Sequence, residues 1–250
     1  MDNRPIAIID SGLGGLAIAQ TIWQQLPYQS TIYLADHEFF PYGERNSIEI
    51  NRRLISIFNF ILAKNCKAVV IACNTITKSS IKFLRDLYSL PIIGTEPAIK
   101  PAIEANLKET IVVWATPNTI NHLDNFDQVK GVACKTLAFD IENKSLSSLT
   151  KILTQLIANN PKPYSALVLG CTHYILIKDL IKKLLPSNVI IIEPSQAIAL
   201  QTEKVLKSQK LLPSSQPIIR IFYTTAHPQK ASKLASFLLK QSIIFKACSI

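Results

Sequence analysis

The sequence predicts an α/β protein with mostly parallel sheets, and two observations support that prediction. Apolar, β-branched runs recur along the whole chain, and amphipathic segments with helical spacing separate most of them. Strands that are apolar on both sides are typical of parallel sheets covered by helices on both faces. In addition, two cysteine segments in different parts of the chain follow the same plan, which indicates two similar halves.

The expected strands and helices alternate along the chain. The strand-like runs are 6–10, 31–36, 68–72, 91–94, 110–115, 166–170, 189–193 and 218–223. The helical candidates are 14–25, 47–64, 76–88, 97–106, 145–158, 174–185, 195–208 and 228–240. Short helical connections between successive strands fit right-handed crossovers. The turn-rich segment PSSQP at 213–217 is the best candidate for a linker.

The composition excludes several classes of protein. The chain has 250 residues, of which 48% are hydrophobic and 18% are charged, as expected for a folded protein with a full core. No apolar run reaches the roughly 18–20 residues that span a bilayer, so we expect no membrane partner. The start of the chain lacks the pattern of a signal peptide. We therefore expect a cytoplasmic protein.

The formal net charge of +10 raises the question of nucleic-acid binding. The lysines, however, are spread along the chain in ones and twos, without a basic run or a basic stripe interleaved with aromatic residues. This distribution favours solvated helix faces, and we expect no nucleic-acid partner. An anionic small substrate would still gain some electrostatic steering from the same charge.

Five cysteines occur, without a CxxC pair or a Cys/His spacing typical of zinc, so we expect free thiols and no bound metal. Cys66 and Cys248 are interpreted as small buried hydrophobic residues. Cys73 and Cys171 differ, because each ends an apolar run and is followed by polar residues. Both are expected where a strand passes into a helix.

The carboxyl edge of a parallel sheet is where ligands bind in α/β proteins. Two halves that each present a cysteine at this edge would place two thiols on one cleft. One thiol can then remove a proton from one face of a carbon while the other returns a proton to the opposite face, which inverts the stereocentre. Disulfide exchange is the competing interpretation, and the lack of a CxxC motif disfavours it.

Several polar residues accompany the two thiols. Asp10 and Ser11 end the first strand, ahead of a glycine-rich turn that lacks the GxGxxG spacing of a dinucleotide site but can expose backbone N–H groups to an anion. His173 follows Cys171 by two residues and can orient or protonate it, although a lone histidine is more often structural. Three further side chains can bind a carboxylate, cap a helix, or do both: Asn74, Thr75 and Thr172.

Four motifs, in this order, resemble bacterial glutamate racemase: DSGLGG at 10–15, PYGER at 41–45, ACNTIT at 72–77 and GCTHY at 170–174. The likeness extends from Ile6 to about Leu239. It implies two pseudo-symmetric α/β domains with mostly parallel sheets and an active site in the cleft between them, with no pyridoxal phosphate, other cofactor or metal. The implied first domain is discontinuous and comprises 1–95 plus 209–250, and the second comprises 96–208.

The resemblance also implies roles for individual residues. Cys73 would be the base for D-glutamate and Cys171 the base for L-glutamate, with Asp10 assisting the first thiol and His173 the second. The implied substrate-binding residues are Ser11, Pro41, Tyr42, Gly43, Asn74, Thr75, Thr116, Thr119 and Thr172. Asp36 and Glu142 would support the site. The substrate would be glutamate, and a homodimer is left open.

The chain departs from the family pattern at four scaffold positions. Lys135, Asp140 and Ile175 stand where proline is usual, and Ala226 stands where glycine is common. These changes spare the proposed proton-transfer residues. The leading hypothesis is therefore a cofactor-independent glutamate racemase that supplies D-glutamate for peptidoglycan. The alternatives are an aspartate or broad-specificity amino-acid racemase, and a diverged, non-catalytic protein that binds a ligand or partner.

Overall fold

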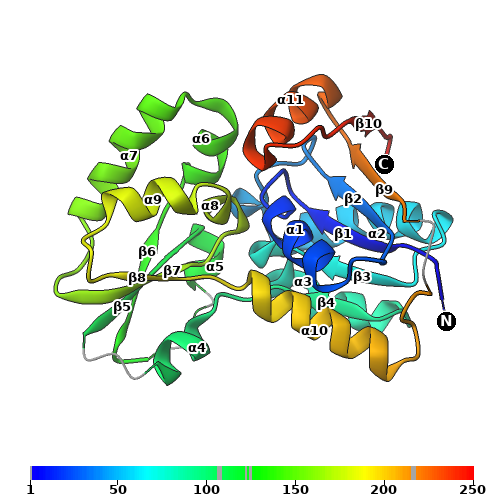
Figure 1. Ribbon diagram of the computed structural model, residues 1–250, viewed down its shortest axis with the longest axis horizontal. Coiled ribbons are helices and arrows are strands. Elements are labelled where there is room, and N and C mark those ends of the chain that lie inside the picture. Colours follow the sequence, from blue (N-terminus) through cyan, green and yellow to red (C-terminus); the bar gives the residue numbers. More distant parts are fainter. Residues whose placement is uncertain (1, 106–108, 122, 124–125, 215–217) are drawn as a thin grey trace.

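The computed structural model describes residues 2–105, 109–121, 123, 126–214 and 218–250. Two lobes lie side by side, each built around one parallel sheet with helices on its faces (Figure 1). Hereafter the first lobe is the one around the six-stranded sheet, and the second lobe is the one around the four-stranded sheet. The α/β class and the parallel sheets predicted from the apolar strands are thus confirmed.

The sheet of the first lobe has the order β10-β9-β2-β1-β3-β4. Its strands are β1 (Ile6–Asp10), β2 (Thr31–Ala35), β3 (Ala68–Ile71), β4 (Ile92–Gly94), β9 (Arg220–Thr224) and β10 (Phe245–Ala247). The sheet of the second lobe has the order β6-β5-β7-β8. Its strands are β5 (Thr110–Ala115), β6 (Val129–Ala133), β7 (Tyr164–Leu169) and β8 (Ile190–Ile192).

Both faces of the first sheet are covered because successive side chains of a strand point to opposite sides. Ile6 and Ile8 of β1 enter one core with α1 (Leu16–Gln25), α10 (Ser195–Ser208) and α11 (Pro228–Leu239). Ala7 and Ile9 enter the opposite core with α2 (Ser47–Ala63) and α3 (Asn74–Leu87). This double burial explains why β1 is apolar at every position.

The second sheet is layered in the same way. Val112 and Trp114 of β5 pack with α6 (Leu137–Asn143), α7 (Leu146–Ala158), α8 (Thr172–Leu176) and α9 (Lys178–Leu184). Ile111 and Val113 face the other side, toward α4 (Ile99–Glu104). A short helix, α5 (Pro117–Asn121), follows β5, and a 3₁₀ turn, η1 (Tyr42–Glu44), follows β2.

Sequence and structure differ mainly at short or half-exposed elements. Strand β6 was not expected, because its sequence VKGVA is largely solvent-exposed and carries a lysine and a glycine. Helix α6 occupies a segment for which no helix was predicted. The single expected helix 174–185 is instead two helices, α8 and α9, which meet at Ile177. The linker candidate 213–217 lies partly outside the described residues, as does the end of the expected helix 97–106.

The chain passes between the lobes twice, between β4 and α4 and again between β8 and α10. Strands β9 and β10 extend the first sheet beyond β2. Helix α10 packs in the core of the first lobe through Ile198, Ala199 and Leu206, although the expected range of the second domain includes it. The domain boundaries stay a prediction.

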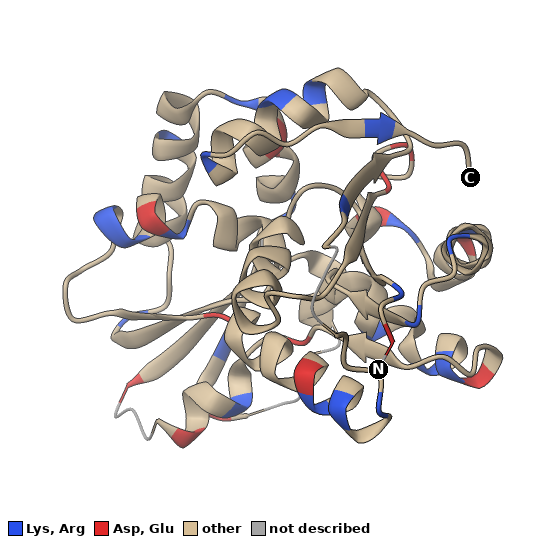
Figure 2. Cartoon of the chain, turned by 45° about the vertical axis from the view of Figure 1, so that its right-hand side comes forward, with Lys and Arg blue, Asp and Glu red and all other residues tan. Residues whose placement is uncertain are grey.

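Lysine and arginine residues are scattered along the ribbon of both lobes (Figure 2). Of the helices in the described ranges, none has the length and apolarity needed to cross a membrane.

Candidate active site

The carboxyl ends of strands from both sheets border one small cavity. It encloses about 20 Å³, and a cavity of roughly 10–15 Å³ is the smallest that holds one water molecule. Its lining residues are Ser11, Phe40, Pro41, Tyr42, Gly43, Cys73, Asn74, Thr75, Thr116, Ala138, Gly170, Cys171, Thr172 and His173. Both thiols singled out in the sequence therefore lie on one buried cavity.

Cys73 lies at the start of a helix, where β3 passes into α3. Its backbone is extended and it is the N-cap residue of α3, so the thiol stands at the helix N-terminus. The side chain is buried, and its Sγ lies 4.0 Å from Ser11 Oγ. Burial and the nearby Asp10 carboxylate raise the pKa of Cys73, which favours the neutral thiol.

Asp10, the last residue of β1, lies buried beneath the cavity. Its Oδ2 accepts hydrogen bonds from Gly15 N (2.6 Å) and from Thr172 Oγ1 (3.4 Å). Its Oδ1 has no hydrogen-bond partner among the described residues. Burial raises the pKa of Asp10, which brings this carboxyl closer to neutral pH than an exposed aspartate and makes it a better proton acceptor.

Cys171 occupies the equivalent place in the second lobe, where β7 passes into α8. It is the N-cap residue of α8 and its backbone is extended. Its Sγ lies 3.9 Å from His173 Nδ1. His173 Nε2 in turn lies 2.7 Å from Glu142 Oε1 on α6. Thiol, imidazole and carboxylate thus form a continuous chain of polar contacts.

Burial is the largest single influence on the pKa of both His173 and Glu142 and opposes their charged forms, but their hydrogen bonds and neighbouring charges together outweigh it. The pKa of His173 is raised well above its ordinary value by Cys171 and Glu142, despite the opposing effect of burial. The pKa of Glu142 is strongly lowered by its hydrogen bonds with His173 and His37, again against burial. At neutral pH the pair is imidazolium and carboxylate, so His173 carries a proton on Nδ1, facing the Cys171 sulfur.

The glycine-rich loop after β1 makes room for this pair. Leu13 N donates a hydrogen bond to Glu142 Oε1 (2.8 Å), so the loop of the first lobe directly contacts the second. A Cβ on Gly12 would lie 2.3 Å from Glu142 Oε1, and a Cβ on Gly14 would lie 2.5 Å from His173 Nδ1. The glycines therefore allow two buried side chains to approach the backbone closely.

Hydroxyl and amide side chains complete the cavity wall. Thr75 Oγ1 lies 3.1 Å from Thr116 Oγ1, which joins α3 to the start of α5. Thr116 in turn donates to Thr119 Oγ1 (3.1 Å). Thr119 lies behind Thr116 rather than on the cavity. Asn74 is buried on the wall, and neither its amide oxygen nor its amide nitrogen has a partner within the described residues.

Asp36 supports the PYG turn from behind. Tyr42 Oη donates to Asp36 Oδ2 (2.6 Å), and Arg53 binds both carboxylate oxygens through Nε and Nη2 (2.9 and 2.6 Å). Burial and the Asp36 carboxylate raise the pKa of Tyr42 well above its ordinary value, so the phenol stays a donor. Asp36 does not line the cavity; it fixes the turn that does.

Asp140 is one of the residues that depart from the family pattern, and its side chain has clear partners in the structure. Its carboxylate accepts from Thr136 Oγ1 (2.7 Å) and pairs with Lys144 (3.0 Å), both within one turn of α6. These local contacts stabilise the helix that carries Glu142. Lys135 is exposed, and Ile175 packs against the core of the second lobe.

Two residues near the site were not predicted from the sequence. Phe40 stacks on the His173 ring with a centroid distance of 5.3 Å. His37 lies 3.0 Å from Glu142 Oε2. Their position just before the PYG motif was the one feature of the sequence that could have indicated a place near the site. A lone histidine or phenylalanine in a loop, however, forms no distinctive sequence pattern. Across the described ranges, no group of three or more His, Cys, Asp or Glu side chains is arranged to hold a metal ion.

Comparison with known proteins gives one consistent result. The chain is 34% identical to glutamate racemase from Pseudomonas paraeruginosa, over 95% of this chain and 94% of the relative. It is 30% identical to the structure of glutamate racemase isoform RacE1 from Bacillus anthracis, with a TM-score of 0.89 and coverage of 100% and 99%. Glutamate racemase from Francisella tularensis in complex with D-glutamate is also 30% identical, with a TM-score of 0.83 and coverage of 100% and 98%. No protein-family model matches the sequence.

Fold and site together define a two-lobed α/β racemase with a thiol at the cavity edge of each sheet. Identity above 30% over nearly the whole length of both chains also fixes the family. The chain belongs to the glutamate racemase family, as the four sequence motifs indicated.

Proposed function

We propose that this protein interconverts L- and D-glutamate through two thiols that act on opposite faces of the α-carbon. The observation that supports the proposal most strongly is the pair Cys73 and Cys171 on one buried cavity, each at the start of a helix and each beside its own acid–base partner. The relative from Francisella, whose structure contains D-glutamate, supports the choice of substrate.

In the direction from D to L, the Cys73 thiolate removes the α-proton. The C–H bond breaks, its electron pair moves onto the α-carbon and the adjacent carboxylate, and the Cys171 thiol delivers a proton to the opposite face. Cys73 must first lose its own proton, because burial and the Asp10 carboxylate favour the thiol. Asp10, whose pKa is raised by burial, is the acceptor that we assign to this proton.

In the direction from L to D the roles reverse, and Cys171 is the base. His173 carries a proton on Nδ1, 3.9 Å from the Cys171 sulfur. It can therefore restore the thiol after Cys171 has given up its proton in the direction from D to L, and it can take that proton back before Cys171 acts as the base in the direction from L to D. Glu142 holds the other side of the imidazole and keeps its ring oriented. General acid–base groups of this kind contribute about 10²- to 10⁴-fold to a reaction rate.

The cavity wall offers the donors that a substrate carboxylate needs. The unpartnered amide of Asn74 and the hydroxyl groups of Ser11, Thr75 and Thr172 lie on it, beside the N-terminus of α3. A buried polar atom without a partner is costly, so a ligand that supplies the missing hydrogen bond is favoured there. Stabilising the carboxylate also stabilises the carbanion that forms next to it, which lowers the barrier to α-proton removal.

Substrate entry requires the lobes to separate. The cavity encloses about 20 Å³, far less than a glutamate molecule occupies. The chain passes between the lobes at two places, between β4 and α4 and between β8 and α10. A hinge at these two segments would open the cavity, and closure would exclude water from the reacting atoms. By the family resemblance, we further propose that the enzyme acts in the cytoplasm and that its D-glutamate serves peptidoglycan synthesis.

Enantiomer conversion by purified protein tests the proposal. Each amino acid, L-glutamate, D-glutamate and L-aspartate, is supplied separately without added cofactor, and both enantiomers are quantified by chiral chromatography. Glutamate should be converted in both directions, and Cys73→Ala and Cys171→Ala should each lower the rate by about 10³-fold or more. A clear preference for aspartate, or a Cys171→Ala variant with normal activity, would contradict the proposal. Cys66→Ala, which removes a buried thiol outside the cavity, is the matched control.

A further inference from the structure

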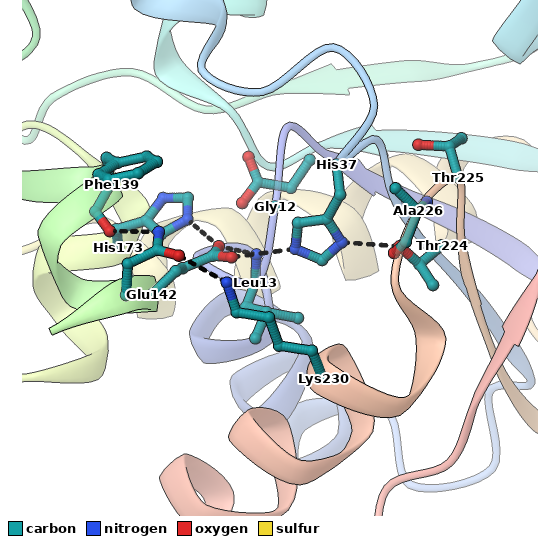
Figure 3. Close-up of polar contacts among 12 residues, drawn as sticks. Gly12, Leu13, His37, Phe139, Glu142, His173, Thr224, Thr225, Ala226 and Lys230 are labelled. Carbon is teal, nitrogen blue, oxygen red and sulfur yellow. Dashed lines mark hydrogen bonds and ion pairs between the residues drawn. The ribbon is translucent and has the colours of Figure 1, made fainter.

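His37 reaches across the boundary between the lobes to hold the carboxylate that orients His173. It belongs to the segment after β2 in the first lobe, whereas Glu142 and His173 belong to α6 and α8 in the second. Its Nε2 lies 3.0 Å from Glu142 Oε2, and its Nδ1 lies 2.7 Å from Thr224 Oγ1 at the end of β9 (Figure 3). The imidazole therefore connects a strand end of the first lobe to the Glu142 carboxylate.

The chemistry of these contacts fixes the orientation of His37. An ionised carboxylate only accepts hydrogen bonds, so the Nε2 that faces Glu142 carries a proton. Nδ1 lies 2.7 Å from Thr224 Oγ1, a fully buried hydroxyl group that also contacts Ala226 O (2.8 Å). Both ring nitrogens have partners, and the ring cannot rotate without losing them.

Glu142 depends on this contact for the position of its second oxygen. Oε1 accepts from both Leu13 N and His173 Nε2, whereas for Oε2 the described residues offer His37 alone. Removing His37 would leave one buried carboxylate oxygen unpaired and free the carboxylate to turn about its terminal bond. His173 would then lose the fixed acceptor that aims its Nδ1 at the Cys171 sulfur.

We propose that His37 is a positioning residue for proton transfer at Cys171. It does not line the cavity and acts only through Glu142 and His173. Because His37 and Leu13 come from the first lobe, the contacts that orient His173 are complete only when the lobes are closed. Closure would thus complete the acid–base partner of Cys171 as well as exclude water. This inference rests on the proposed function, in which Cys171 is the base for L-glutamate.

The test compares His37→Ala, His37→Gln and Thr224→Val with the unsubstituted protein. His37→Ala should lower kcat/KM for glutamate by roughly 10- to 100-fold, as expected when a hydrogen bond to a buried charged group is lost. The loss should be equal in both directions, because enantiomers have equal free energies. His37→Gln retains a donor that can reach Glu142 and should recover part of the rate. Thr224→Val removes the partner of Nδ1, and its kcat/KM should lie between the values for His37→Ala and His37→Gln.

A direction-specific readout separates positioning from a general structural effect. Glutamate carrying deuterium at the α-carbon is used in each direction, and the isotope effect on kcat/KM is measured. In His37→Ala the step at Cys171 becomes more rate-limiting, so the isotope effect should rise for L-glutamate and fall for D-glutamate. Ser11→Ala, whose hydroxyl group lies beside Cys73, is the matched control and should shift both values in the opposite sense.

The outcomes separate this inference from the proposed function. Absence of glutamate turnover by the unsubstituted protein would overturn the proposed function and the inference with it. Two other outcomes, each with normal turnover by the unsubstituted protein, would overturn the role of His37 alone. One is an unchanged kcat/KM in all three variants. The other is a pair of isotope effects that move in the same direction for both enantiomers. Thermal unfolding of each variant identifies a variant that does not fold, and His37→Gln and Thr224→Val then decide the result.

Discussion

Glu142 is a buried carboxylate that meets two histidines from different lobes. Hydrogen bonds from these histidines strongly lower its pKa, even though burial alone would raise it. A carboxylate whose pKa is lower in the folded than in the unfolded state stabilises the fold above its unfolded pKa, and this stabilisation is lost as the pH falls. Glu142 therefore stabilises the folded protein most above its ordinary pKa of 4.5.

Replacing Glu142 by Gln should lower the free energy of unfolding at about pH 7 by roughly 3 kcal/mol, because the substitution leaves a buried imidazolium without its counter-ion. The deficit should shrink at about pH 3.5, where the carboxylate in the unfolded chain is already mostly protonated. Urea unfolding of both proteins at the two pH values measures this difference. Glu104→Gln, a change at an exposed position of α4, is the control. An equal deficit at both pH values would contradict the assignment.

At the scale of elements, the loop from β1 to α1 links the first sheet to the acid–base pair of the second lobe. Its residue Gly14 packs so closely that an added Cβ would lie 2.6 Å from the backbone nitrogen of His173 and 2.6 Å from Thr172 Oγ1. Backbone cannot yield as a flexible side chain does, so α8 would have to move. Helix α8 carries Thr172 and His173, and Cys171 is its N-cap.

Gly14→Ala should therefore lower kcat by about 10-fold or more while leaving the secondary structure intact. Displacement of His173 from Cys171 is the physical cause. Gly131→Ala is the matched control, because the nearest atoms to a Cβ there are side-chain methyl groups of Ile120 and Leu123 at 3.0 to 3.5 Å, and none of these three atoms belongs to the backbone. Steady-state kinetics and circular dichroism of both variants check the prediction. Similar kinetics for the two variants would show that the close approach of loop and helix does not matter.

The strands of the central sheets were predictable because burial on two faces leaves an unbroken apolar run, as in β1, β3 and β5. Strand β6 escaped prediction because edge position and exposure permit polar residues in it. Residues of the site that end such strands, Cys73 and Cys171, were predictable for the same reason. His37 was not, because its partners Glu142 and Thr224 are far away in sequence and only the tertiary fold brings them together.

At the scale of the whole molecule, two parallel sheets point their carboxyl ends toward one cavity. This arrangement places two thiols in similar settings on one cavity, one from each lobe. The two are not identical, since Cys73 has a buried carboxyl group as its partner and Cys171 has an imidazolium held by Glu142. The difference follows from the sequences after β1 and β7. We expect it to appear in the isotope effects of the two directions, since kcat/KM must change equally in both.

In the proposed mechanism the two thiols move one proton each, on opposite faces of the same carbon. Incubating L-glutamate with the purified protein in D₂O, without cofactor, tests this mechanism. NMR follows loss of the α-proton while polarimetry follows loss of optical rotation. We predict that both decline together and that Cys73→Ala or Cys171→Ala stops the loss of rotation. Unchanged α-proton signal and unchanged rotation with the unsubstituted protein would contradict the account.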